Sequence, residues 1–168
     1  MNTVTLRRDD PLAELDNIVA KVAERDRQRA AQNAEAHDEM RRFLAAFHAA
    51  CDAQVRPAME AVLERLREHG GGGVIEQHPG GEARFRHPSL ILWISLEGEI
   101  VGAPRADLEP YLELEADVEH RAIQVSEGDM WRKAGGKRSG RIGSWQMSDL
   151  TREHVIDELL AIARRAAG

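Results

Sequence analysis

The first apolar pattern along the chain has the spacing of a helix. Large apolar residues recur three and four positions apart and therefore share one helix face; they are Leu12, Leu15, Ile18, Val19 and Val22. Asp10 is a suitable N-cap, and Pro11 suits the first helical position because its missing N–H would have no partner there. We predict a helix over about 11–36.

A second apolar stripe follows a stretch that carries no large apolar side chain. Residues 24–39 are mainly Ala, Gln, Arg, Asp and Glu, which suit a helix but leave it little to bury. The stripe then consists of Met40, Phe43, Leu44, Phe47, Cys51, Val55, Met59, Val62, Leu63 and Leu66. We predict a helix over about 38–68 that is kinked near Pro57, because proline removes one hydrogen bond from the helical ladder. Residues 1–69 would thus form a helical arm, which the glycines at 70–73 end.

Beyond these glycines the apolar pattern changes from helical to alternating, which is typical of strands. Residues 90–96 carry apolar side chains on both faces of the predicted strand, so we expect this strand to be internal in a sheet. Residues 112–118 alternate apolar with acidic side chains, which predicts one buried and one solvated face. We predict strands over 74–78, 83–86, 90–96 and 112–118, a return strand from 123, and a last strand over 142–147, with 74–78 and 83–86 forming a short hairpin.

The C-terminal segment has clear signals for a helix over 152–166. Thr151 is a natural N-cap, and Leu150 and Val155 can pack against each other across it. The apolar face of this helix should lie on the sheet. We therefore predict an α+β fold, in which a long N-terminal helical arm precedes a two-layer unit, residues 74–168, made of an antiparallel sheet covered by a C-terminal helix.

Composition sets limits on the environment of the chain. It is 42% hydrophobic and 31% charged, which suits a folded protein rather than a disordered one. Its single cysteine, Cys51, excludes an intrachain disulfide. We expect neither a secretory signal nor a membrane helix, because no apolar run has the required length. We therefore expect a cytoplasmic protein that does not contact membranes.

Positive charge is concentrated in one predicted hairpin. Five cations without an intervening acid fall within ten residues; they are Arg132, Lys133, Lys137, Arg138 and Arg141. Either the hairpin binds an anion such as nucleic acid, or it is an ordinary solvated loop. The glycines around it do not make a phosphate loop, because Arg138 follows Lys137 where Ser or Thr would hold magnesium.

Two other groups of side chains are of residue types that can take part in catalysis or metal binding. His48, Cys51 and Asp52 have helical spacing, but no second ligand pair is present, so we expect a buried thiol and no metal site. Candidate acids and bases are Asp117, Glu119, His120, Glu127 and Asp129. Acids that alternate with leucines are typical of a solvated sheet face. We therefore expect no catalytic residue and no cofactor, and rank an enzyme with a carboxylate and histidine site on the sheet third among the hypotheses.

The first-ranked hypothesis is a non-enzymatic interaction or adaptor protein, expected to be a homodimer, in which the helical arm docks onto itself or onto a protein partner. The second stripe has more apolar surface than one small sheet obviously covers, which is typical of a docking helix. The expected interface residues are Phe43, Leu44, Phe47, Met59, Val62 and Leu66. The second-ranked hypothesis is binding of nucleic acid or a phosphate ligand by the basic hairpin.

Overall fold

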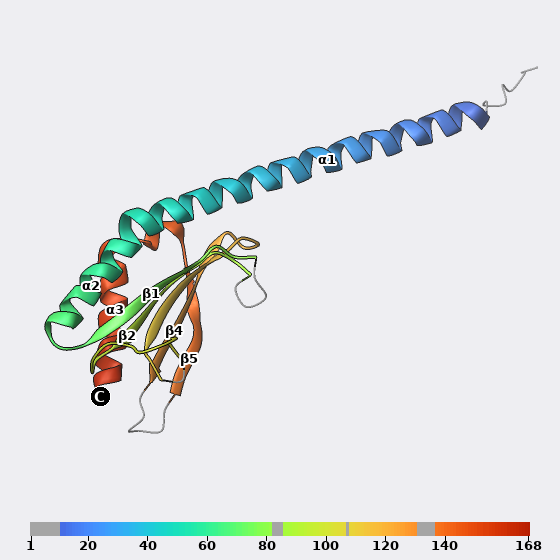
Figure 1. Ribbon diagram of the computed structural model, residues 1–168. Coiled ribbons are helices and arrows are strands. Elements are labelled where there is room, and N and C mark those ends of the chain that lie inside the picture. Colours follow the sequence, from blue (N-terminus) through green and yellow to red (C-terminus); the bar gives the residue numbers. More distant parts are fainter. Residues whose placement is uncertain (1–10, 82–85, 107, 131–136) are drawn as a thin grey trace, which may run out of the picture. The chain divides into compact units, whose positions relative to one another are not determined.

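The computed structural model describes residues 11–81, 86–106, 108–130 and 137–168 (Figure 1). The chain divides into two units, one that ends at Arg41 and one that spans Arg42–Gly168. Among the described residues, no helix has the length and apolar content needed to cross a bilayer.

Helix α1, Pro11–Ala50, supplies all the described structure of the first unit and continues into the second. Every side chain from residue 12 to residue 38 is exposed. The predicted separation into helices over 11–36 and 38–68 differs from the structure, because α1 is continuous through residue 37. Neither glycine nor proline occurs between residues 12 and 56, and pairs such as Glu24 with Arg27 add a little helical stability.

A π-helical turn, Cys51–Val55, joins α1 to helix α2, Arg56–Glu68. Pro57 has no N–H to donate to the carbonyl four residues before it, so regular α-helical bonding is interrupted there. The N–H of Arg56 instead donates to the oxygen of Cys51, five residues back. The irregularity predicted near Pro57 is therefore a widened turn that immediately precedes it.

Five antiparallel strands form a sheet in the order of the sequence: β1 Gly72–His78, β2 Ser89–Ser95, β3 Tyr111–Asp117, β4 Ala122–Met130 and β5 Lys137–Trp145. β1 pairs directly with β2, with His78 opposite Ser89. The predicted hairpin between 74–78 and 83–86 is therefore wrong in its pairing; residues 82–85 themselves lie outside the described residues. The last strand begins earlier than predicted and carries an irregular register opposite Val125 and Ser126.

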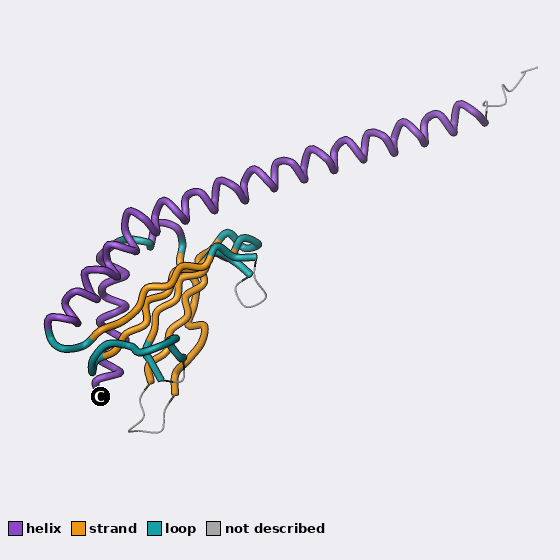
Figure 2. Tube along the Cα trace, viewed as in Figure 1, coloured by secondary structure: helices purple, strands orange, loops and turns teal. Residues whose placement is uncertain are grey.

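The main core lies between the sheet and its helices. Helix α3, Arg152–Ala167, begins at Thr151, whose hydroxyl accepts a hydrogen bond from the His154 N–H at 3.2 Å. Helix α2 contacts β1 and β2, α3 contacts β3 and β4, and both helices lie on one side of the sheet (Figure 2). Buried members of this core include Phe47, Val55, Met59, Leu92, Leu114, Val125, Val155, Leu159 and Ile162. The predicted α+β fold class is confirmed.

The opposite face of the sheet carries a smaller apolar cluster. Ile91, Trp93 and Tyr111 are buried there, and the Trp93 indole donates to a Glu76 carboxylate oxygen at 2.9 Å. Strand β2 is thus buried on both faces, as its apolar pattern predicts. A Cβ on Gly128 would lie 2.5 Å from Cε1 of Tyr111, so this glycine makes room for the ring.

Candidate interaction surfaces

The six residues of the predicted interface have two different environments. Phe47 and Met59 are 2% and 0% exposed and belong to the core of this chain. The other four, Phe43, Leu44, Val62 and Leu66, are partly buried and pack against that core. Side chains buried within one chain have no surface left for a partner. That these residues mediate self-association stays a prediction, and only the four partly exposed side chains retain surface for it.

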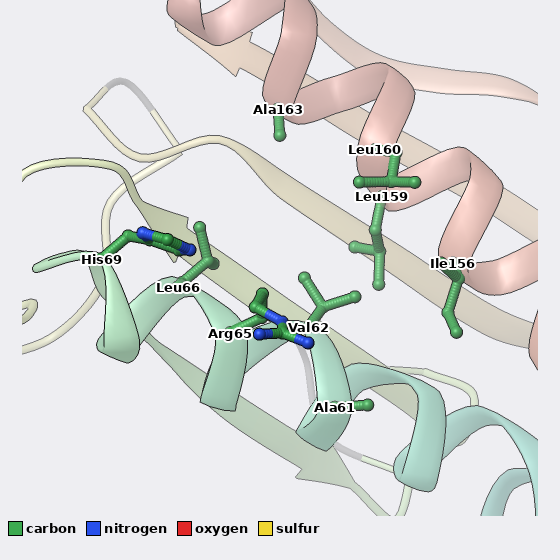
Figure 3. A pocket seen from close by; sticks show the side chains of 9 residues that line it. All are labelled: Ala61, Val62, Arg65, Leu66, His69, Ile156, Leu159, Leu160 and Ala163. Atoms are coloured by element: carbon green, nitrogen blue, oxygen red, sulfur yellow. The ribbon is translucent and has the colours of Figure 1, made fainter.

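An apolar groove separates helices α2 and α3 (Figure 3). Its volume is about 310 Å³, and seven of its nine lining residues are apolar. The lining residues are Ala61, Val62, Arg65, Leu66, His69, Ile156, Leu159, Leu160 and Ala163. Figure 3 shows the α2 side chains facing those of α3 across the groove. We call this surface the α2/α3 groove.

The groove arises from the residues that the two helices present to each other. Ala61 and Ala163 are too short to fill the space between the helices. On α3, Ile156, Leu160 and Ala163 lie beside the residues that pack on the sheet, so the apolar face of that helix is broader than the sheet alone can cover. Leu160 is 40% exposed as a result. Val62 and Leu66 are among the residues that the sequence predicts for an interface, whereas the α3 residues are not; the signal that could have found them is the extra width of the apolar face of that helix.

A second apolar surface lies on α1. Its members are the five residues of the first apolar pattern, Leu12, Leu15, Ile18, Val19 and Val22, which are 67%, 53%, 51%, 59% and 41% exposed. We call this surface the N-terminal stripe. Isolated exposed apolar residues such as Val101, 96% exposed, are ordinary. Five within three turns on one helix face form a contiguous patch, which is typical of a binding surface.

The basic hairpin can be placed only in part. Arg132 and Lys133 lie outside the described residues, and Lys137 and Arg138 belong to β5 with side chains that are likewise not described. Arg141 pairs in register with Ser126, and one of its guanidinium nitrogens lies 3.9 Å from Oδ2 of Asp117. Anion binding by these five cations stays a prediction of the sequence.

Among the acid and base candidates, Asp117 and His120 come together at the β3–β4 turn. Asp117 accepts hydrogen bonds from the His120 N–H at 3.0 Å and from Gln124 at 2.7 Å, and the His120 ring nitrogen lies 2.9 Å from it. Burial alone would raise the pKa of Asp117, but these interactions together lower that pKa to about 2. So acidic a group is a weak base at neutral pH. The arrangement instead holds the turn, in which Arg121 has a φ of 51°.

Glu127 stands apart from this turn. Its side chain is 5% exposed and lies 2.7 Å from a guanidinium nitrogen of Arg165 on α3. This ion pair connects helix α3 with strand β4 of the sheet. Glu119 is exposed, and the side chain of Asp129 lies outside the described residues.

The Cys51 thiol has the environment of a core residue. It is 4% exposed, and burial, together with the nearby charge of Asp52, raises its pKa to about 12 although Arg56 opposes the shift. The thiol therefore stays protonated, and only a thiolate is a strong nucleophile or metal ligand. Within the described part of the chain, no three His, Cys, Asp or Glu side chains are grouped so that they could hold a metal ion.

Comparison of the chain with protein families, with curated proteins and with solved structures finds no match.

Proposed function

We propose that this chain is a non-enzymatic interaction protein that self-associates through helix α1. The observation that carries the proposal is the N-terminal stripe, whose five large apolar side chains are 41% to 67% exposed on one helix face. A helix without a packed apolar face is marginally stable in water. Association would remove this surface from water and stabilise the helix at the same time.

The expected gain is moderate. Complete burial of a Val, Leu or Ile side chain contributes about 1.5–3 kcal/mol, so covering five half-exposed ones contributes on the order of 5 kcal/mol per copy. Association costs roughly 4–15 kcal/mol in lost translational and rotational freedom. The stripe therefore supports a reversible dimer, and a single charge placed in it should be enough to disrupt that dimer.

The test compares two valine substitutions of equal chemistry. Val19→Lys places a charge in the middle of the stripe, whereas Val101→Lys places the same charge at an isolated position that is 96% exposed. We expect light scattering to report dimers for the unmodified chain and for Val101→Lys, and monomers for Val19→Lys at the same concentration. Circular dichroism should show that all three proteins are folded. Dimers of equal stability in all three would contradict the proposal.

A further inference from the structure

Two N-terminal stripes that face only each other make a small interface. Side chains of this size, half exposed, present on the order of 100 Å² each, so two stripes together bury roughly 1,000 Å², whereas specific interfaces bury about 1,200–2,000 Å². A dimer held by α1 therefore needs additional apolar surface. The described residues contain such a surface in the α2/α3 groove.

We propose that the N-terminal stripe of one copy docks in the α2/α3 groove of a second copy, and that the exchange is reciprocal. This inference rests on the proposed self-association and identifies the surface that receives the stripe. An amphipathic helix that lays its apolar face in an apolar groove is a common mode of recognition. Because each copy both gives a helix and receives one, two groove linings are buried in addition to the two stripes, which brings the buried area to about the lower end of the range of specific dimers.

The two surfaces agree in length. Ten residue steps separate Leu12 from Val22, which at 1.5 Å per residue is about 15 Å. The α2 wall runs from Ala61 to His69, about 12 Å, and the α3 wall from Ile156 to Ala163, about 10 Å. The middle of the stripe, at Val19, can therefore lie against the middle of the groove, at Leu160.

The polar residues beside the two surfaces indicate an orientation. The polar residues of the groove are Arg65, which forms an ion pair with Glu68 at 2.8 Å, and His69, which is the C-cap residue of α2. Glu14 and Asp16 flank the stripe on its two sides, since each lies about 100° around the helix axis from the centre of the stripe. Figure 3 shows His69 and Ala163 at one end of the groove. A docked helix that runs antiparallel to α2 brings its acidic first turns to that end, and opposed helix dipoles favour the same direction.

Disulfide cross-linking tests the inference. Chains carrying Val19→Cys are mixed with chains of a different mass that carry Leu160→Cys and are then oxidised. Both positions are exposed, at 59% and 40%, whereas the native Cys51 is 4% exposed and its raised pKa keeps it unreactive. We expect a mixed dimer between the two variants. Val101→Cys replaces Val19→Cys in the matched control, which should give no mixed dimer.

The possible results separate the two proposals. Cross-links of Val19→Cys with itself, without mixed dimers, would overturn groove docking and leave self-association intact. Chains that remain monomeric by light scattering and form no cross-link would overturn both. If one chain that carries both substitutions forms its disulfide internally and stays monomeric, the stripe docks within its own chain, which also overturns both.

A charge in the groove supplies an independent measurement. Leu160→Lys should weaken dimerisation at least tenfold, because the partner stripe would have to bury an unpaired ammonium group. Val101→Lys, with its charge in open solvent, should leave the dissociation constant within twofold of the unmodified value. Equal dissociation constants for Leu160→Lys and Val101→Lys would overturn docking in the groove.

Discussion

Replacing Phe47 with alanine tests whether the middle of the second apolar stripe belongs to the core of a single chain. Phe47 is 2% exposed and lies among the helix and sheet residues of the main core. Deleting a buried phenylalanine ring costs about 3–5 kcal/mol, since the transfer free energy is lost and a cavity remains. Leu15→Ala on the same helix is the matched control. Leu15 is 53% exposed, so at a low concentration, where the chain is monomeric, its truncation should change the stability of the second unit by less than about 0.5 kcal/mol.

Urea titration followed by tryptophan fluorescence reports on the second unit, which contains Trp93 and Trp145. With a slope of roughly 2 kcal/mol per molar, a loss of about 4 kcal/mol lowers the unfolding midpoint by about 2 M. Leu15→Ala should lower it by no more than about 0.25 M, for the same slope.

Two results would refute this reasoning. Equal midpoints for Phe47→Ala and Leu15→Ala would show that the ring is not buried in the core. A loss of stability that grows with protein concentration would place Phe47 at a contact between copies, because mass action links the stability of a dimer to its concentration. A core position predicts a difference from the unmodified chain that is the same at every concentration.

Three further predictions follow from the described contacts. Asp117→Asn should destabilise the protein by about 1–2 kcal/mol at pH 7. Because the pKa of Asp117 is lowered to about 2, the stability that its carboxylate contributes is present above about pH 4 and is lost as pH falls through 2. The denaturation curves of variant and parent should therefore converge near pH 2. Arg165→Met should cost about 3–5 kcal/mol in urea unfolding by leaving Glu127 buried without its cation, and Glu127→Leu in the same chain should recover most of the loss. Amide exchange should be fast over 24–38, where every side chain is exposed, and slow over 155–162; equal protection would contradict the exposure of that helical segment.

Elements that local signals determine were predictable from the sequence. Thr151 caps α3 as expected, and the two-sided apolar pattern at 90–96 marked an internal strand. The partner of β1 was not predictable in this way. Pro79, Gly80 and Gly81 resemble a tight turn, but β2 offers β1 a ladder of seven paired residues. The long-range pairing replaces the nearby hairpin that local turn residues favoured.

The α2/α3 groove could not be predicted because its two walls are remote in sequence. Leu66 and Leu160 are 94 positions apart. The width of the apolar face of one helix does not reveal which other helix that face lies against. The same limit applies to Phe47 and Met59, whose spacing fits a core and a docking surface equally well. Their burial is decided by the position of the sheet, which comes from other parts of the chain.

Self-association through α1 is tested most directly by the molar mass of the unmodified chain over a range of concentrations. One chain has a mass of 18.7 kDa. We expect light scattering to report a mass that rises toward twice this value by about 100 μM. A dissociation constant in that range is weak for an interface as large as those of specific complexes. A mass that stays at 18.7 kDa throughout that range would contradict the account.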